Sequence, residues 1–157
     1  MQQTYIMVKP EFANSWKLLK YVRDQIKKQG LKILKASFVQ YTREDAQEHY
    51  AEHFRGSYED AKPFYQGLED YITSDKAYGM IVVGNNAKAK MRELIKELRI
   101  TIPAMLGREP DPQKNVLHGS DLTENSEVNE IKIFNRLAKK YKQEKDAMRL
   151  ACANMTI

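Results

Sequence analysis

The sequence predicts a domain of mixed α and β structure in which helices cover a sheet. Short runs rich in β-branched and aromatic residues alternate with longer segments whose apolar residues recur every three or four positions. Helical segments separate the strand-like runs, and this order is typical of an α+β or α/β sandwich. The chain has 157 residues, 42% of them hydrophobic and 30% charged, which is ordinary for one globular domain.

The N-terminal part of the chain is expected to form a strand, a helix and a second strand. Residues 4–9 read as the first strand, which a proline ends. Asn14 or Ser15 can cap the helix that follows, and Gly30 is placed to end it. Residues 31–41 alternate imperfectly between apolar and polar side chains, as a half-buried strand would.

The middle of the chain is expected to be helical. Thr42, with Asp45 three residues later, resembles a capping box that opens a polar helix through His53. A second helical segment is predicted over residues 59–72, with an interruption near Pro63 because proline breaks the helical hydrogen-bond pattern.

The rest of the chain should contain two further strands and two helices. The predicted elements are a strand over 77–83, a helix over 87–98, a short strand over 116–118 and a helix from about residue 125. Residues 99–114 carry several prolines and a glycine, so they cannot form one long regular element.

Composition narrows the cellular setting and the class of partner. The net charge of +5 and the pI near 9.2 suit an anionic partner such as a nucleotide, a nucleic acid or an acidic membrane. No apolar run approaches the roughly 20 residues of a membrane span, and the N-terminus lacks the pattern of a signal peptide. Cys152 is the only cysteine, which excludes an internal disulfide. We therefore expect a cytoplasmic protein without a membrane partner.

The segment from Asn115 to Asp121 is the strongest candidate for a functional site. Within it, His118 follows a short apolar stretch and precedes a glycine and two small polar residues. Neutral imidazole is a good nucleophile near pH 7 and can hold a transferred group covalently. A partly buried histidine at a turn fits the same residues, so the segment alone leaves both interpretations open.

Several cations and an aromatic residue elsewhere favour a nucleotide site. Phosphoryl transfer requires positioning and positive charge around the phosphate oxygens. Lys9 is expected at a strand end, Arg92 within a helix and Arg108 in a loop rich in glycine and proline, while Phe64 can stack on a base. Each cation alone is more simply a solvated charge, but together with the histidine they suggest a nucleotide cleft.

These residues occur in the order and approximate spacing of nucleoside diphosphate kinases, which the chain resembles from about Thr4 to Phe134. The resemblance is carried by Met7-Val8-Lys9-Pro10, His49-Tyr50, Pro63-Phe64-Tyr65, Arg92, Arg108 and Asn115 to Asp121. The central pattern Asn-x-x-His-Gly-Ser-Asp is weak alone and is a strong signal when these other residues accompany it. We therefore expect a single domain over residues 1–157, with a core of about 4–134 and a C-terminal helical extension over 135–157.

The resemblance implies a fold, a reaction and a cofactor. The fold would be a ferredoxin-like α/β sandwich with a central antiparallel sheet covered by helices, assembled as a hexamer or tetramer. The reaction would move the γ-phosphate of a nucleoside triphosphate to a nucleoside diphosphate, by a ping-pong mechanism through a phosphohistidine at His118. Magnesium would be carried by the nucleotide phosphates and not by protein side chains alone. Nucleic acid would not be required.

The resemblance also assigns roles to residues around the histidine. It implies Lys9 and Asn115 for sugar hydroxyls and phosphates, Arg92 and Arg108 for phosphates, Phe64 for the base, and Tyr50 and Ser120 beside the imidazole. A glutamate of the following helix would hold the ring nitrogen that is not used for attack. Ungapped matching places Asn129 there, and a one-residue slip places Glu130. We favour Glu130, because Glu130-Ile131 matches the family's Glu-Ile pair, while Glu127 lies on the same helix face.

The chain departs from the family pattern where phosphates are held. Residues 96–100 replace a run whose threonine contacts phosphate, and Thr101 would substitute for it only if the loop shifts. Residues 51–62 include an insertion, and the segment between Arg108 and Asn115 is shortened where the family builds oligomer contacts. A simple strand would also place Asn115 and His118 on opposite faces, unless the strand ends or bends between them.

Other functions remain open from the residues alone. His49, Glu52 and His53 match an inverted zinc-peptidase signature, but their helix is mostly polar, and histidines at this spacing are more often solvated. The basic segment 139–145 can follow nucleic-acid phosphates, although its interspersed acidic residues fit a solvated face. A catalytically weakened relative that binds nucleotides or nucleic acid is a further alternative.

Overall fold

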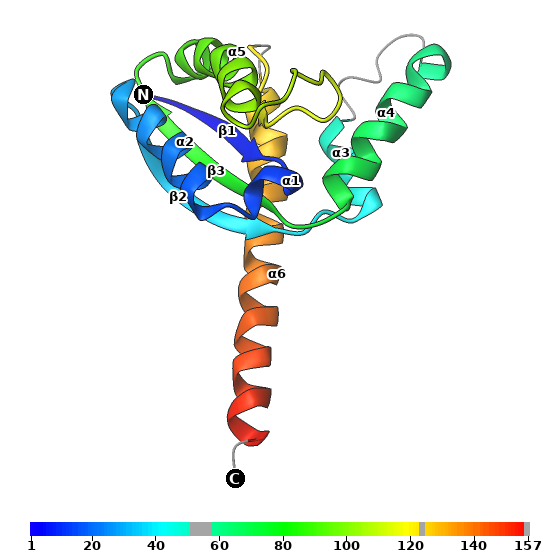
Figure 1. Ribbon diagram of the computed structural model, residues 1–157. Helices are drawn as coiled ribbons and strands as arrows, with labels where there is room; N and C mark the ends of the chain where they lie inside the picture. The colour runs from blue at the N-terminus through cyan, green and yellow to red at the C-terminus, as the bar shows by residue number, and fades with distance from the viewer. Residues whose placement is uncertain (51–57, 123–124, 156–157) are drawn as a thin grey trace.

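The computed structural model describes residues 1–50, 58–122 and 125–155. At its centre lies a four-stranded sheet with the strand order β2-β3-β1-β4 (Figure 1). Its strands are β1 (Gln2–Val8), β2 (Lys32–Val39), β3 (Ala77–Gly84) and β4 (Leu117–Gly119). Every neighbouring pair is antiparallel. This sheet and its covering helices confirm the expected ferredoxin-like sandwich.

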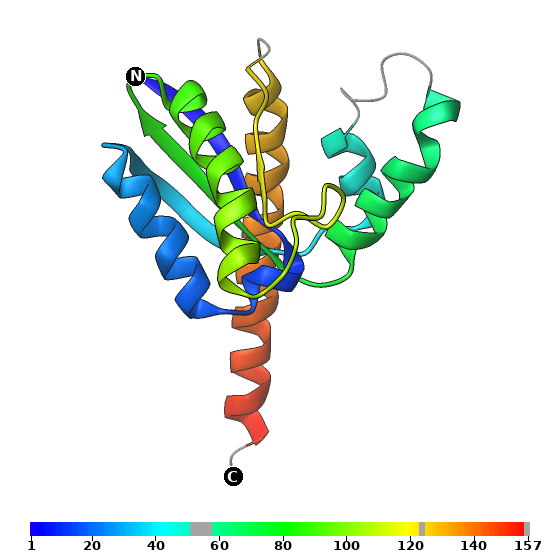
Figure 2. The ribbon, with the colours of Figure 1, turned by 45° about the horizontal axis from the view of Figure 1, so that its top comes forward.

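Helices cover both faces of the sheet (Figures 1 and 2). One face carries α1 (Pro10–Ala13), α2 (Trp16–Lys28) and α5 (Ala87–Met105). The other face carries α3 (Arg43–Tyr50), α4 (Tyr58–Thr73) and the first half of α6 (Ser126–Met155). The rest of α6 continues past the body of the protein, and its residues 142–155 are exposed. None of these helices has the length and hydrophobicity that a membrane span requires.

The side chains of β1 point alternately into two apolar cores, one on each face of the sheet. Tyr5 and Met7 lie in the core under α3, α4 and α6, whereas Ile6 and Val8 lie in the core under α2 and α5. Successive side chains of a strand point to opposite faces, and helices cover both faces of this sheet, so the side chains of a central strand are buried on both sides. β1 therefore has no exposed side chain from Thr4 onward.

Three predicted helix-capping signals are confirmed, at the two ends of α2 and at the start of α3. The Ser15 side chain accepts a hydrogen bond from the N–H of Leu18 at 3.3 Å and caps α2. Gly30 follows the end of this helix with a positive φ of 75°. At α3, the hydroxyl of Thr42 accepts from the N–H of Asp45, and the Asp45 carboxylate accepts from the N–H of Thr42, which is a reciprocal capping box.

Three predictions about helices were wrong. A short helix that was not expected, α1, begins at Pro10, because proline fits the first position of a helix. α4 is continuous through Pro63, which lies near the helix start and removes a single hydrogen bond. α5 runs beyond residue 98 to Met105, because Ile102 and Pro103 are buried and extend its packed face.

The end of α5 follows ordinary helix-capping chemistry. Gly107 has a φ of 69°, a left-handed conformation that glycine adopts without steric cost. The N–H of Arg108 then donates to the carbonyl of Pro103 at 2.8 Å and closes the last turn. The irregular segment therefore begins after this turn, and not at Arg99 as expected.

Candidate active site

His118 lies on β4, which forms one edge of the sheet. Met7 of β1 is its partner in the antiparallel register. The imidazole lies on the face covered by α3, α4 and α6, with its ring centroid 6.5 Å from that of Tyr5. The preceding residue, Leu117, packs into the opposite core. The side chain of His118 is thus held by the sheet and is 8% exposed.

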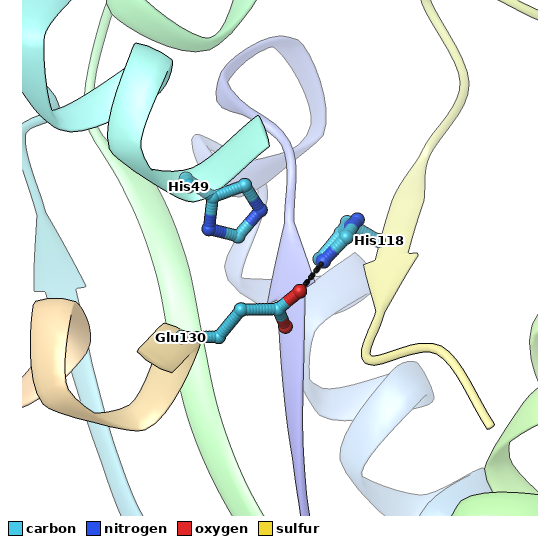
Figure 3. Close-up of side chains that lie close together, drawn as sticks. All are labelled: His49, His118 and Glu130. Atoms are coloured by element: carbon cyan, nitrogen blue, oxygen red, sulfur yellow. Dashed lines mark hydrogen bonds and ion pairs between the residues drawn. The ribbon is translucent and has the colours of Figure 1, made fainter. Parts of the chain in front are cut away.

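Glu130 of α6 holds the imidazole from inside the protein (Figure 3). Nε2 of His118 lies 3.0 Å from a carboxylate oxygen of Glu130, which is 4% exposed. A carboxylate only accepts hydrogen bonds, so this contact favours the tautomer with its proton on Nε2. In this tautomer Nδ1 carries the lone pair of the ring.

Ser120 holds the carboxylate of Glu130 in place. Its hydroxyl donates to the second oxygen of Glu130 at 2.8 Å and accepts a hydrogen bond from the N–H of Tyr5 at 3.1 Å. Ser120 therefore acts on the imidazole through Glu130. Among the candidate residues of α6, Glu130 is the one that contacts His118, since Glu127 pairs with Lys88. Asn129 donates to the carbonyl of Glu48.

His49 and Tyr50, at the end of α3, pack beside His118. The ring centroid of His49 lies 4.5 Å from that of His118, and the centroid of Tyr50 lies 6.2 Å from it. His49 is 2% exposed, so the expectation of a solvated residue was wrong. The helix packs against α4 and α6, which turns this part of its surface inward. Glu52 and His53 of the zinc-peptidase pattern lie outside the described residues.

His49, His118 and Glu130 bring their ligand atoms within 4.8 Å of one another. Two imidazoles and a carboxylate suit a transition metal such as zinc. Magnesium prefers a shell of oxygen ligands and water. This cluster therefore does not fit a magnesium ion held by side chains.

Lys9 is a buried cation at the end of β1. Its side chain is almost inaccessible, with 3% of the residue exposed, and its Nζ lies 5.9 Å from the centre of the Tyr71 ring. Burial and, to a smaller extent, the charge of Arg99 lower the pKa of Lys9 to about 7, against the opposing effect of Asp111. The amine therefore loses its proton easily until an anion binds nearby.

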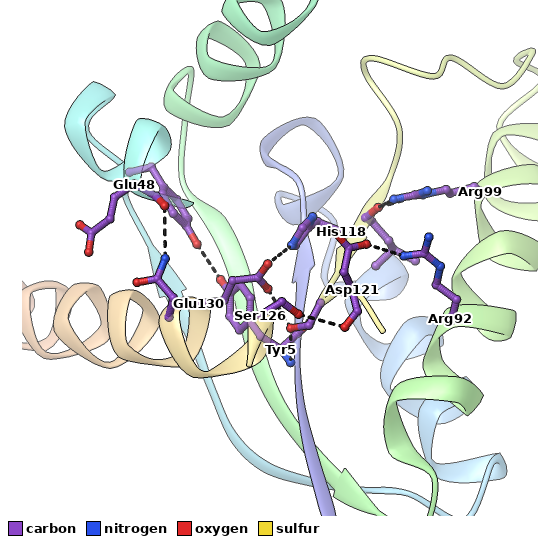
Figure 4. A network of polar contacts seen from close by, with 12 residues as sticks. Tyr5, Glu48, Arg92, Arg99, His118, Asp121, Ser126 and Glu130 are labelled. Carbon is purple, nitrogen blue, oxygen red and sulfur yellow. Dashed lines mark hydrogen bonds and ion pairs between the residues drawn. The ribbon is translucent and has the colours of Figure 1, made fainter. Parts of the chain in front are cut away.

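The arginines expected to bind phosphate are each paired with a carboxylate. Arg92 of α5 donates to Asp121 at 2.8 Å (Figure 4). Arg108 donates to Glu11, and its guanidinium lies over the ring of Phe12. These ion pairs hold the cations in place without burying them, since both arginines remain exposed.

Arg99 is an additional cation near His118. The sequence predicted that it lies in an irregular segment after a helix ending at residue 98. It lies on α5, and its Nε and Nη2 both donate to the carbonyl of Leu117, at 3.0 and 2.8 Å. A helix predicted to end at residue 98 gave no reason to place this side chain near His118. The seven-residue spacing from Arg92 was the one available signal, because it puts both arginines on one helix face.

The segment before β4, which contains Asn115, contacts α4, which contains Phe64. Asn115 precedes β4, which begins at Leu117, so the alternation of the strand does not apply to it. Its side-chain amide donates to the carbonyl of Pro112 at 3.1 Å. Phe64 of α4 is 46% exposed, and its carbonyl accepts a hydrogen bond from Gln113. The aromatic face is thus accessible for stacking.

Comparison with known proteins agrees with this geometry. The family model described as nucleoside diphosphate kinase matches residues 2–139. A nucleoside diphosphate kinase of Staphylococcus epidermidis is 34% identical over 144 residues, which cover 85% of this chain and 87% of that protein. Its counterpart in Desulforamulus reducens is 34% identical over 140 residues, with the same shares of the two chains.

Solved structures lead to the same family. A halophilic nucleoside diphosphate kinase from Halobacterium salinarum, in complex with CDP, has a TM-score of 0.69 and 30% identity, over 85% of this chain and 86% of that chain. The nucleoside diphosphate kinase of Aquifex aeolicus has a TM-score of 0.68 and 27% identity, over 85% and 94% of the chains. The chain therefore belongs to the nucleoside diphosphate kinase family, and it is a phosphotransferase with nucleoside-diphosphate kinase activity.

Proposed function

We propose that this kinase works by a ping-pong mechanism through a phosphohistidine at His118. The observation that carries the proposal is the contact between Nε2 of His118 and the buried carboxylate of Glu130. It leaves Nδ1 as the nucleophile and fixes the ring against rotation. A carboxylate behind the ring also stabilises the positive charge that develops on the imidazole when Nδ1 forms a bond.

The two half-reactions use the same atoms in opposite directions. The Nδ1 lone pair attacks the γ-phosphorus of a nucleoside triphosphate, and the bond to the bridging oxygen breaks as the diphosphate leaves with that electron pair. A terminal oxygen of a second diphosphate then attacks the phosphorus, and the bond to Nδ1 breaks. The Nε2 proton stays on the ring, hydrogen-bonded to Glu130, in both steps.

We propose that the surrounding residues position the nucleotide. Lys9, Arg92 and Arg108 would bind phosphate oxygens, Asn115 would bind phosphate or sugar hydroxyls, and Phe64 would stack on the base. Tyr50, buried beside His118, would orient the transferred group. Ion pairs with Asp121 and Glu11 keep two of these cations extended until phosphate replaces the carboxylates.

Magnesium and assembly complete the proposal. Magnesium bound to the nucleotide would neutralise part of the phosphate charge.

A homo-oligomer, hexamer or tetramer, is supported by exposed apolar side chains where α5 ends: Ile100, Met105 and Leu106. Light scattering after size-exclusion chromatography tests the assembly. A cytoplasmic location is supported by the single cysteine, Cys152, because one cysteine cannot form an internal disulfide.

One labelling experiment tests the mechanism. The protein is incubated with γ-labelled ATP and magnesium, and the product is treated with acid and with base. We expect a phosphoprotein that is acid-labile and base-stable, and no label in His118→Ala. Label retained in His118→Ala would remove His118 from the mechanism. An intact protein that takes up no label would instead be the catalytically weakened relative.

A further inference from the structure

Arg99 reaches around the free edge of β4, beside the reactive histidine. The N–H of Lys9 donates to the carbonyl of Val116, and the N–H of Ser120 donates to the carbonyl of Tyr5. In an antiparallel pair, inward and outward backbone groups alternate, so the carbonyl of Leu117 points away from β1. Arg99 binds this outward carbonyl with two of its nitrogens (Figure 4).

The guanidinium of Arg99 is half-buried, and its hydrogen bonds go to a backbone carbonyl. Among residues 1–50, 58–122 and 125–155, no carboxylate forms an ion pair with Arg99. Arg92 lies on the same helix and lines one cavity together with Arg99 and Ser120. A guanidinium that is partly withdrawn from water and keeps unused N–H donors is a favourable place for an anion. The position of Arg99 in this cavity is therefore the feature to be explained.

Two further cations, Arg92 and Lys9, lie near Arg99. Burial lowers the pKa of Arg99 and the charge of Arg92 lowers it further, while Tyr50 and Asp121 act in the opposite direction. The charge of Arg99 in turn lowers the pKa of Lys9, in the same direction as burial, and it opposes the rise in pKa that burial causes at Tyr50. Arg99 thus lies close enough to influence the groups on both sides of His118. Cations that repel one another in this arrangement favour a bound anion.

We propose that Arg99 is a phosphate-binding residue of this kinase and contacts the phosphates of the nucleotide next to His118. This inference rests on the proposed function, because it takes the nucleotide phosphates as the anion. Arginine has five N–H donors in a planar fork, and the carbonyl of Leu117 uses only part of them. The remaining donors can form charge-assisted hydrogen bonds to phosphate oxygens, while the bound carbonyl keeps the fork in position.

A structural role is the competing explanation. Arg99 could simply fasten α5 to β4, in which case its loss would lower stability without a specific effect on phosphate binding. The two roles differ in their dependence on the ligand. A phosphate-binding arginine affects ligands in proportion to their phosphate groups, whereas a fastening arginine affects all ligands alike.

Calorimetric binding distinguishes the two roles. The ligands are AMP and the β,γ-imido analogue of ATP, whose terminal phosphate is not transferred, each with magnesium. For Arg99→Met we expect the affinity for the triphosphate analogue to fall by about 10- to 100-fold, the range for a lost charged hydrogen bond. The affinity for AMP should change by less than about threefold. Lys90→Met is the matched control, a cation of the same helix whose Nζ donates to the carbonyl of Gln29 and which does not line this cavity, and it should bind both ligands as the wild type does.

Equal losses for both ligands, or no loss for either, would overturn the proposal. If Arg99→Met does not fold, Arg99→Lys decides the question. One ammonium group cannot hold the carbonyl of Leu117 and a phosphate together, so affinity for the analogue should still fall severalfold. Unchanged affinity in Arg99→Lys would contradict the inference. Because no phosphate is transferred, these results are independent of whether His118 becomes phosphorylated.

Discussion

Replacing Glu130 with glutamine removes a charge from the site while keeping its shape. The amide oxygen of glutamine can still accept a hydrogen bond from Nε2 of His118, and the glutamine side chain has nearly the same volume as that of glutamate. The negative charge behind the imidazole disappears, at a distance of 3.0 Å between Nε2 and the acceptor oxygen. The second oxygen becomes an NH2 group, so the Ser120 hydroxyl must accept a hydrogen bond from the amide where it now donates one. In the proposed mechanism this charge matters most when phosphorus bonds to Nδ1 and the ring becomes cationic.

The size of the effect follows from burial and from the hydrogen bonds. Glu130 is 4% exposed and His118 is 8% exposed, so water does not screen the pair strongly. A hydrogen bond to a charged group contributes about 1.5–3 kcal/mol, and each 1.36 kcal/mol is tenfold in rate. We therefore expect Glu130→Gln to form the phosphoenzyme about 10- to 100-fold more slowly. Nucleotide affinity should change little, because Glu130 does not reach the nucleotide in this mechanism.

A rapid-quench experiment measures the expected difference. Excess protein is mixed with γ-labelled ATP and magnesium, and the reaction is stopped with base at times from milliseconds to seconds. The rate constant of labelling and its dependence on protein concentration separate chemistry from binding. Glu127→Gln is the matched control, since Glu127 lies on the same helix face but pairs with Lys88 at 2.5 Å.

Two results would refute the reasoning. Labelling of Glu130→Gln within twofold of the wild-type rate would mean that the charge behind the ring is irrelevant to attack. An equal slowing in Glu127→Gln would mean that α6 as a whole, and not the contact with His118, supports the reaction. Circular dichroism and thermal melting of both variants establish that each is folded before the rates are compared.

Three other predictions concern the site and its support. The pKa of Lys9 is about 7 in the free protein, so binding of an anionic nucleotide at pH 8 should take up a proton, and affinity should fall as pH rises above 7. Calorimetry in buffers of different ionisation enthalpy measures this uptake, which Lys9→Met should abolish; an absence of uptake in the wild type would contradict it. Gly119→Ala should lower stability by about 1–3 kcal/mol, because the added Cβ overlaps the side chain of Ile95, and an unchanged melting temperature would show that the core yields easily. Thr42→Ala should cost about 1 kcal/mol in urea unfolding through loss of the α3 capping box with Asp45, and a value near zero would count against that cap.

Local sequence signals were reliable where an element depends on its own residues. The cap of α2 at Ser15, the stop at Gly30 and the capping box of Thr42 require only nearby backbone atoms. The continuation of α5 past residue 98 was missed for the opposite reason. Its last turns persist because Ile102 and Pro103 are buried by residues distant in sequence, and packing outweighed the local effect of proline.

The site shows the same division between local and tertiary information. The segment from Asn115 to Asp121 and the scattered cations were sufficient to indicate a phosphate-transferring histidine and its family. They favoured Glu130 as the residue of α6 that holds the imidazole, by its match to the family's Glu-Ile pair, but left Glu127 and Asn129 open. That choice depends on the rotation of α6 against the sheet, and a shift of one residue turns a helical side chain by about 100°.

The sequence by itself determined the order of the strands and of the longer helices, the family and the central position of His118, because periodicity, caps and motif residues are properties of neighbouring positions. Only the tertiary structure decided that Glu130 holds the ring, that His49 is buried beside it, and that Arg99 reaches the free edge of β4. These three contacts join segments far apart in the chain. Their geometry depends on how α3, α5 and α6 pack against the sheet, and that packing is a property of the whole fold.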